Sequence, residues 1–279
     1  MSSIFYIDGE YVPSTDASIP ADDLAVLRGY GVFDFMRTYN GKPFHLDAHL
    51  KRLENSARLI ELDLPNSLDD IRRITLETIA RNGYPESNVR IVVTGGTSPD
   101  NITPNGGARL LVMVTPHKPL PEAWYRDGVK IITNRTERYL PEAKTINYIP
   151  AIVALKKARK QNAVDAIYVD KTDSVLEGTT TNLFAFLGDR LITPGKAVLL
   201  GITRQAVLEL ASDRFAVEVS DLKLDDLMRA DEVFITASNK EICPVRQVDD
   251  QIIGQGVPGP KTRFLMERFA HLTAAYGNM

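Results

Sequence analysis

A proline-rich segment near the middle of the chain most limits how this sequence can fold. The segment PHKPLPE, residues 116–122, has three prolines in seven residues, and prolines this dense interrupt both helices and sheets. The chain has 279 residues, which is long for a single hydrophobic core. We therefore expect a small N-terminal α/β domain over residues 1–115, a linker over 116–124 and a larger domain over 125–279.

The N-terminal part combines strand and helix patterns. The segment IFYIDGEYV alternates around Asp8-Gly9, which predicts a β-hairpin. Apolar residues recur every three or four positions from Leu46 onward, and this spacing predicts a helix with Asp47 as its N-cap. The other elements predicted here are a helix between Ser67 and Gly83 and the strands NVRIVVT and RLLVMVT.

Beyond the proline-rich segment, strand and helix patterns alternate more closely. VKIITN, DAIYVD and DEVFITA predict strands, and NLFAFLGDRLIT predicts a hairpin turned at Gly188-Asp189. Helices are expected at NYIPAIVALKKARKQ, TRQAVLELAS and KTRFLMERFAHLTAAY. The chain is therefore expected to be an α+β protein of two domains.

Charge and cysteine usage exclude several classes of partner. The formal net charge is −3 and the pI is near 5.9, so neither a nucleic-acid nor a membrane partner is expected. The first residues lack the pattern of a signal peptide. The single cysteine, Cys243, fits a reducing cytoplasm. The four histidines have no zinc spacing, so no metal site is expected.

One lysine stands in unusual surroundings. Lys144, in the segment AKTINY, is flanked by small, apolar and amide side chains. An isolated lysine usually keeps its ammonium in water at the surface. Three polar clusters follow, and each is expected at a strand end or a helix start, where backbone N–H groups are unpaired. These clusters are LEGTTTN, which contains Glu177, GITR at 201–204 and TASN at 236–239.

The cluster GITR has two interpretations. It can simply begin a helix, with Gly201 before the first turn. It can also bind a phosphate, because backbone amides and the hydroxyl of Thr203 would lie at the positive end of that helix. A phosphate site of this kind also calls for a basic residue, preferably an arginine.

Five short sequence segments of the chain resemble the motifs of one enzyme family. FHLDAHLKRL, KTIN, LEGTTTNLF, GITR and EICPV, in this order and spacing, resemble the class IV aminotransferases, which are fold-type IV enzymes dependent on pyridoxal 5'-phosphate. The resemblance runs from the first hairpin to the last helix. It implies a small N-terminal α/β domain, a larger pyridoxal-phosphate-binding domain with a β-barrel-like sheet core, and an aminotransferase activity.

The resemblance also implies roles for individual residues. Lys144 resembles the catalytic Schiff-base lysine, Glu177 the carboxylate that holds the pyridine nitrogen, and Arg52 the phosphate-binding arginine. A lysine whose surroundings exclude water has a lowered pKa, and its amine acts as a nucleophile and base. The cofactor-binding residues implied by the resemblance are Arg52, Lys144, Glu177, Thr181, Asn182, Gly201, Ile202, Thr203, Thr236 and Ser238.

Two arginines bear on the substrate. Arg28 precedes Gly29 in LRGYG, where most family members have an aromatic residue, and Arg90 alternates with buried-type residues in NVRIVVT. Each arginine either pairs with a structural acid or binds a substrate carboxylate. The better-known D-amino acid transaminases have T-R-G-T-S-P where this chain has TGGTSP, with Gly95 in place of the arginine.

The substrate expectation follows the resemblance. A less common group of D-amino acid transaminases has LRGYG and an arginine in the neighbouring strand, so we expect a D-amino acid such as D-glutamate or D-alanine as donor and 2-oxoglutarate as acceptor. The alternatives are an L-branched-chain aminotransferase, a lyase similar to the aminodeoxychorismate lyases, and a non-catalytic binding protein. The substrate-binding residues expected are Arg28, Phe33, Arg90, Tyr148 and Thr180.

A homodimer is also implied by the resemblance. In this family a loop of the neighbouring subunit completes each active site, so Arg28 is expected to reach the site of the partner. The role of Cys243, which stands where relatives have threonine, is left open.

Overall fold

The computed structural model describes residues 2–277, which form two compact units. Among the described residues, unit 1 comprises residues 2–118, Ala143–Tyr148 and residues 275–277, and unit 2 comprises Pro119–Glu142 and Ile149–Ala274. The first division falls inside the proline-rich segment. The sequence patterns assigned Ala143–Tyr148 to the larger domain, but this segment belongs to unit 1 because its backbone pairs with a strand there.

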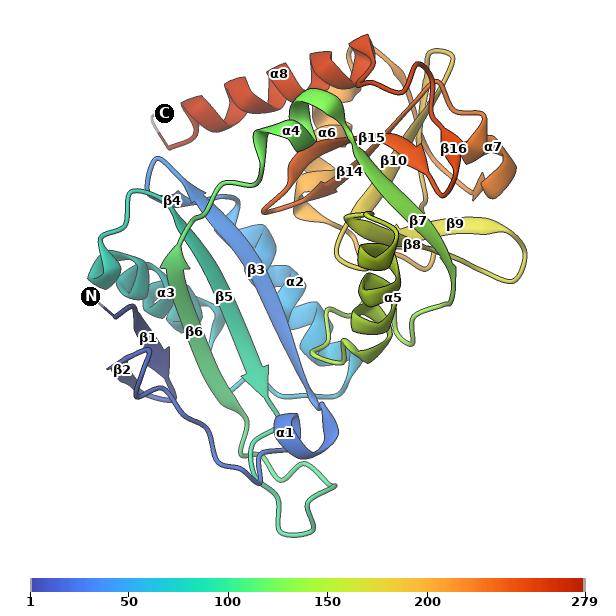
Figure 1. Ribbon diagram of the computed structural model, residues 1–279. Helices are drawn as coiled ribbons and strands as arrows, with labels where there is room; N and C mark the ends of the chain where they lie inside the picture. Colours follow the sequence, from blue (N-terminus) through green and yellow to red (C-terminus); the bar gives the residue numbers. More distant parts are fainter. Residues whose placement is uncertain (1, 278–279) are drawn as a thin grey trace. The chain divides into compact units, whose positions relative to one another are not determined.

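Unit 1 is built on an antiparallel sheet of six strands, in the order β2-β1-β6-β5-β3-β4 (Figure 1). The hairpin predicted around Asp8-Gly9 is confirmed, since both residues have positive φ angles, of 48° and 111°. The strands are β1 (Ile4–Ile7), β2 (Glu10–Pro13), β3 (Gly31–Tyr39), β4 (Lys42–Pro43), β5 (Ser87–Thr94) and β6 (Arg109–Pro116).

The helices of unit 1 are α1 (Leu24–Arg28), α2 (Leu46–Leu59) and α3 (Leu68–Asn82). Helix α3 has the limits that the sequence predicted: the Ser67 hydroxyl accepts from the N–H of Asp70, and Gly83 ends the helix with φ 60°. The N-cap predicted for α2 is wrong. His45, with φ 47° and no capping hydrogen bond, precedes the helix, and Asp47 lies in its first turn.

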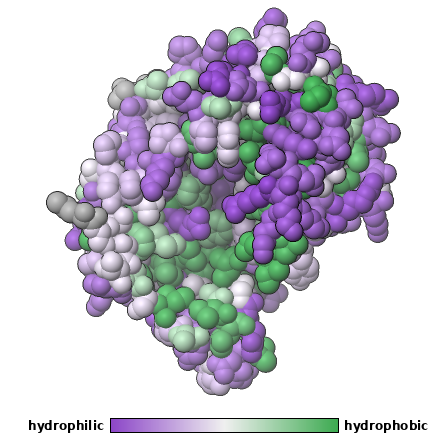
Figure 2. Space-filling view, viewed as in Figure 1, coloured by the Kyte–Doolittle hydropathy of each residue, from purple (hydrophilic) through white to green (hydrophobic). Residues whose placement is uncertain are grey.

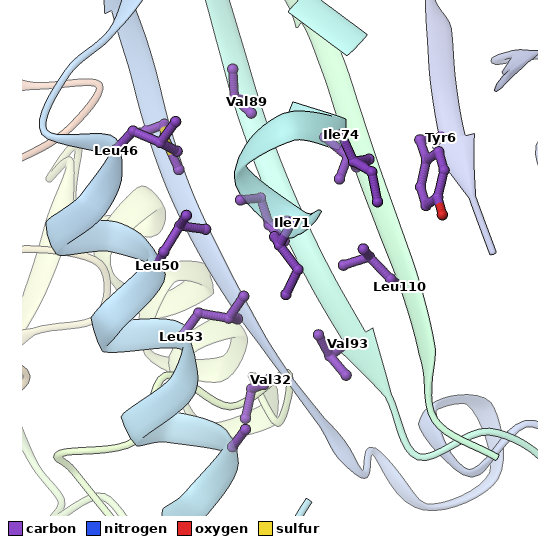
Figure 3. Close-up of a cluster of buried hydrophobic side chains, with 14 of the residues drawn as sticks. Tyr6, Val32, Leu46, Leu50, Leu53, Ile71, Ile74, Val89, Val93 and Leu110 are labelled. Carbon is purple, nitrogen blue, oxygen red and sulfur yellow. The ribbon is translucent and has the colours of Figure 1, made fainter. Parts of the chain in front are cut away.

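Helices α2 and α3 pack against one face of this sheet. In Figure 3, Leu46, Leu50 and Leu53 of α2 point toward the strands, and side chains of α3 lie beside them. Alternation places Val89, Ile91 and Val93 of β5 on the same face, where all three are fully buried. The opposite face carries Arg90 and Val92, and Figure 2 shows hydrophobic surface around smaller hydrophilic areas there.

Unit 2 contains a mixed sheet of ten strands that curls into a half-barrel. Strand β7 runs parallel to both of its neighbours, and β10 and β11 form the hairpin predicted at Gly188-Asp189. The strands are β7 (Val129–Arg135), β8 (Asp165–Val169), β9 (Ser174–Gly178), β10 (Asn182–Leu187), β11 (Arg190–Thr193), β12 (Ala216–Val219), β13 (Leu222–Lys223), β14 (Glu232–Ala237), β15 (Glu241–Val248) and β16 (Gln251–Ile252).

A hydrophobic core lines the sheet of unit 2. The rings of Phe184 and Phe234 stack at 4.8 Å on neighbouring strands, and both side chains are fully buried. The helices are α4 (Glu122–Asp127), α5 (Ile149–Lys160), α6 (Ile202–Ala211), α7 (Leu224–Met228) and α8 (Pro260–Ala275). The expected α+β fold with a barrel-like sheet in the larger part is therefore confirmed.

Replacement of Leu53 by alanine tests the core of unit 1. Leu53 is 0% exposed, and a buried Leu→Ala change typically costs about 2–5 kcal/mol of unfolding free energy. The control is Leu76→Ala on α3, because that side chain is 44% exposed. We expect a clear loss of stability in urea titrations followed by circular dichroism for the first variant alone. Equal losses in both would contradict the packing described.

Candidate active site

The segment that carries Lys144 is held along the edge of β3. The N–H of Phe33 donates to the carbonyl of Lys144 at 2.9 Å, and the N–H of Ile146 donates to the carbonyl of Gly31 at 3.1 Å. Gly31 permits this close approach, because a Cβ atom there would lie 3.0 Å from the Cδ1 atom of Ile146. The backbone of Lys144 is thus fixed by β3, a strand more than a hundred residues earlier in the chain.

Aromatic side chains surround the lysine within unit 1. The Lys144 Nζ lies 4.7 Å from the centre of the Phe33 ring, which presents its face to the ammonium. The Tyr148 ring contacts that of Phe33 edge to face, with centres 5.5 Å apart. The structure therefore brings together Lys144, Phe33 and Tyr148, three residues that the sequence had singled out.

Helix α2 approaches the same lysine through Ser56. The Ser56 hydroxyl accepts from the backbone N–H of Lys144 at 3.0 Å and donates to the carbonyl of Arg52 at 2.8 Å. Ser56 is fully buried, so both bonds are made away from water. No sequence pattern singled out Ser56, although its position four residues after Arg52 places it on the same helix face.

A buried charge cluster joins β3 to α2. Asp34, which is 0% exposed, accepts from Arg52 Nε at 2.9 Å and from Arg52 Nη2 at 2.7 Å. The His49 Nδ1 lies 2.6 Å from the same carboxylate. Asp34 therefore orients two nitrogens of Arg52, the residue expected to bind the cofactor phosphate, by a bidentate contact. Sequence reasoning missed Asp34 and His49, although His49 and Arg52 interrupt the apolar face of α2.

The protonation states follow from this cluster. Burial alone would raise the pKa of Asp34, but the positive charge of Arg52 and the bonds from His49 and Arg52 outweigh it and hold this pKa well below its usual range. Burial lowers the pKa of His49, although the charge of Asp34 opposes this shift. Near neutral pH the cluster contains an ionised Asp34, a charged Arg52 and a neutral imidazole.

In unit 2 the carboxylate of Glu177 is held at both oxygens. Arg138 Nη1 donates to Oε1 at 2.5 Å, and the N–H of Leu199 donates to Oε2 at 2.9 Å. Glu177 is 4% exposed and lies on β9. A charged donor and a backbone amide both stabilise the ionised form of a carboxylate. Sequence reasoning missed Arg138, which stands thirty-nine residues before its partner.

The threonines that follow Glu177 do not share one role. Thr179 and Thr181 both donate their hydroxyls to the buried Asp165, at 2.5 and 2.8 Å. Thr180 points the other way, is exposed, and accepts from Lys240 Nζ at 3.2 Å. The Nδ2 of Asn182 donates to the carbonyl of Leu199 at 2.8 Å. Thr181 and Asn182, expected at the cofactor, therefore fix the shape of this turn.

The segment GITR forms the N-terminus of α6. Gly201 is the N-cap, and no side chain caps the helix. A Cβ atom at Gly201 would lie 2.0 Å from Asn182 Oδ1, so only glycine fits there. Within residues 2–277, the buried Oγ1 of Thr236 also has no hydrogen-bond partner. A helix start without a side-chain cap fits a phosphate group.

Within the part of the chain that the structure describes, the two arginines expected at the substrate have no structural acid. Arg90 lies exposed on the sheet face away from the helices. Its guanidinium carbon lies 5.4 Å from the centre of the Phe33 ring. Arg28 is also exposed and donates to the carbonyl of Leu27. Across residues 2–277, neither arginine has a carboxylate within 4.0 Å.

The structure also accounts for Gly95, where better-known D-amino acid transaminases have an arginine. A Cβ atom at Gly95 would lie 2.4 Å from the ring of Tyr30. The Tyr30 hydroxyl donates to the carbonyl of Ile60 at 2.9 Å, which fixes the ring in place. No larger side chain fits this position without moving Tyr30.

Comparison with known proteins assigns the family. Residues 31–248 match the family model described as amino-transferase class IV. The chain is a class IV aminotransferase. This aminotransferase is 32% identical to a putative branched-chain-amino-acid aminotransferase of Methanocaldococcus jannaschii, over 98% of this chain and 97% of that protein. It is 31% identical to a D-alanine aminotransferase of Listeria monocytogenes, over 98% and 97% of the two chains.

Solved structures share the fold over nearly the whole aminotransferase. The branched-chain amino acid aminotransferase of Escherichia coli matches with a TM-score of 0.93 and 26% identity, over 99% of this chain and 96% of that chain. A second branched-chain amino acid aminotransferase, solved with pyridoxamine 5'-phosphate, matches with a TM-score of 0.92 and 28% identity, over 99% and 95% of the two chains.

The family determines the cofactor. Class IV aminotransferases use pyridoxal phosphate, and the uncapped start of α6 fits its phosphate.

Within residues 2–277, no helix is long and apolar enough to span a membrane. The same residues contain no group of three ligand-type side chains that could hold a metal ion.

Replacement of Asp34 by asparagine tests the buried charge cluster. The change leaves Arg52 with a neutral partner, and breaking a buried ion pair typically costs about 3–5 kcal/mol. The control is Asp69→Asn, because the side chain of Asp69 is 89% exposed and such a pair contributes about 0–1 kcal/mol. Unfolding in urea at pH 7 measures both.

The same variant changes the dependence of stability on pH. The folded pKa of Asp34 is depressed, so its contribution is present above the unfolded value of about 4 and is lost as the pH falls through the folded value. The folded pKa of His49 is also depressed, so stability begins to fall below about pH 6.5. Wild-type stability should decrease further as the pH falls below about 4, and Asp34→Asn should remove that part of the decrease. An unchanged profile would contradict the assignment.

Proposed function

We propose that this aminotransferase moves an amino group between a D-amino acid, of the D-glutamate or D-alanine type, and a 2-oxo acid such as 2-oxoglutarate. The observation that carries this proposal is the pair of exposed arginines, Arg28 and Arg90, which no acid of the described chain neutralises. Guanidinium groups without a structural partner suit substrates that carry carboxylates. The LRGYG loop and the D-alanine aminotransferase relatives support the D configuration.

Lys144 and Glu177 have different roles in the transfer of the amino group. Bound pyridoxal phosphate supplies the aldehyde that accepts the amino group and a ring that draws electrons from the substrate α-carbon. The Lys144 Nζ binds the cofactor and moves the α-proton, and the face of Phe33 shields this amine from water on one side. Glu177 keeps the ring nitrogen protonated, because Arg138 and the Leu199 amide hold it as a carboxylate.

The phosphate and substrate contacts are assigned by the same reasoning. The phosphate is bound by the guanidinium of Arg52, the hydroxyl of Ser238 and the amides of Gly201, Ile202 and Thr203. Arg90, beside Phe33, binds a substrate carboxylate. Phe33, Tyr148 and Thr180 line the substrate pocket.

We assign a homodimer in the cytoplasm to this enzyme. Beside Arg28 on α1, the side chains of Val26 and Leu27 are 58% and 39% exposed. Apolar side chains next to a cation suit a surface that a second copy covers. In the dimer Arg28 serves the active site of the neighbouring subunit.

The single cysteine, buried as a free thiol, suits a reducing compartment.

L-branched-chain transamination is the second candidate, because one relative and both solved structures named above are branched-chain aminotransferases. Arg28 distinguishes the candidates, because it stands where most family members have an aromatic residue. A branched-chain amino acid has one carboxylate and an apolar side chain, whereas glutamate has two carboxylates for two cations.

A half-reaction tests the donor. The enzyme loaded with pyridoxal phosphate is mixed, without a 2-oxo acid, with D-glutamate, D-alanine or L-leucine. We expect the D-amino acids to bleach the visible absorption of the cofactor and to release one equivalent of 2-oxo acid. Bleaching by L-leucine alone would overturn the D-specific proposal in favour of the branched-chain candidate. Bleaching by none of these amino acids would favour the lyase.

Arg90→Leu tests the carboxylate contact. Loss of a charge-assisted hydrogen bond costs about 1.5–3 kcal/mol, so KM for D-glutamate should rise roughly tenfold or more. The matched control is Arg81→Leu, since Arg81 also lies over an aromatic ring, that of Tyr11 at 4.1 Å, but is paired with Glu77. Steady-state kinetics measures both. An equal KM in wild type and Arg90→Leu would remove Arg90 from the substrate site.

A further inference from the structure

A buried lysine lies in the hairpin loop between β14 and β15. Ala237 pairs with Glu241 across this hairpin, so Lys240 is the last residue of a three-residue loop. The N–H of Lys240 donates to the carbonyl of Ala237 at 3.0 Å, and its own carbonyl accepts from the Tyr125 hydroxyl at 3.2 Å. Lys240 is only 8% exposed. Its backbone is fixed and its side chain is confined.

No carboxylate of the described residues neutralises this cation. The Lys240 Nζ donates to Thr180 Oγ1 at 3.2 Å, and within residues 2–277 no acidic oxygen lies within 4.0 Å of it. Lys223 in the same unit provides a contrast, because it contacts the Ser174 hydroxyl but also Asp221 at 3.0 Å. Burial of an unpaired ammonium is costly, so buried cations are normally paired or bind a ligand.

The neighbouring turn leaves Thr180 available for a ligand. Asp165 accepts the hydroxyls of Thr179 and Thr181, and only Thr180 of the three points outward. The Thr180 oxygen accepts from Lys240, so its own proton remains to be donated. The ammonium likewise has three donors and uses one on this hydroxyl. Together the two side chains present several N–H and O–H donors and a positive charge.

We propose that Lys240 and Thr180 form a carboxylate-binding subsite for the amino acid and 2-oxo acid substrates. The inference rests on the proposed function and goes beyond it by adding a second cationic contact, in unit 2, to that of Arg90. Thr180 stands three residues after Glu177, the carboxylate assigned to the cofactor ring. The Lys240 ammonium contacts this turn, so we assign it to the substrate and leave the phosphate to the start of α6.

Binding of a non-reactive dicarboxylate tests the subsite. Glutarate has two carboxylates and neither an amino nor an oxo group, and butyrate has one carboxylate. Isothermal titration calorimetry of each acid with the enzyme loaded with pyridoxal phosphate gives Kd without turnover. In Lys240→Met we expect the Kd of glutarate to rise about tenfold or more. Lys240→Arg should retain most of the affinity, and Thr180→Val should lose less than Lys240→Met.

The matched control is Lys223→Met, which removes the same charge from a lysine that also contacts a hydroxyl. Its Kd for glutarate should equal that of the wild type. If butyrate binding weakens in parallel with glutarate binding, the subsite holds the carboxylate that all substrates share. If only glutarate binding weakens, the subsite holds the second carboxylate of a dicarboxylic substrate. Unchanged glutarate binding in Lys240→Met would overturn the inference.

Two further measurements distinguish a substrate contact of Lys240 from a phosphate contact and from misfolding. Titration of the apoenzyme with pyridoxal phosphate, followed by visible absorption, gives the affinity for the cofactor. A loss of cofactor affinity with unchanged glutarate binding would assign Lys240 to the phosphate and overturn the inference. Failure of the half-reaction with every amino acid would instead reject the proposed function. Thermal unfolding of each variant identifies any loss that comes from misfolding.

Discussion

The bidentate contact between Asp34 and Arg52 is the interaction on which the catalytic part of unit 1 depends. It joins β3 to α2 at a fully buried position, and His49 adds a third polar group. From α2, Ser56 reaches the backbone of Lys144, and from β3 the backbone of Phe33 reaches the same residue. The lysine is therefore fixed by two elements that the charge cluster holds together. A buried ion pair of this kind fixes geometry more than it adds stability.

Unit 2 uses buried carboxylates for the same purpose. Asp165 determines the shape of the turn that follows Glu177, because two threonine hydroxyls and an amide donate to it. Glu177 is itself held at both oxygens, by Arg138 and by a backbone amide. A carboxylate held at both oxygens has one orientation, and catalytic groups require such fixed positions. Each unit thus contains one carboxylate that shapes the backbone near a residue assigned to the cofactor.

Five of the cations fall into two groups, according to whether they have a carboxylate partner. Arg52 and Arg138 are largely buried and have carboxylate partners. Arg28, Arg90 and Lys240 have none in the described chain, and their neighbours are aromatic rings, a carbonyl or a hydroxyl. A cation that folding leaves without an acid favours an anionic ligand. We therefore propose that the second group binds the substrate carboxylates, whereas the carboxylate partners of the first group hold Arg52 and Arg138 in position.

The sequence by itself determined the family, most of the elements and the residue types of the cofactor chemistry. Local patterns predict well those features that depend on local backbone preferences. These features are the hairpin at Asp8-Gly9, both ends of α3 and the hairpin at Gly188-Asp189. Lys144 and Glu177 were predicted as cofactor residues because their motifs are short and contiguous. The N-cap of α2 was missed, since His45 has a left-handed conformation that no side chain signals.

Only the tertiary structure decided which side chains meet across long separations. Arg138 and Glu177 are 39 residues apart, Lys144 and Ser56 are 88 apart, and Lys240 and Thr180 are 60 apart. No local pattern encodes these pairs, because they arise from strand order and from the packing of helices on sheets. Burial was also decided at this level. Alternation placed Arg90 on the correct face of β5, but packing determined that this face is exposed and that Lys240 is buried.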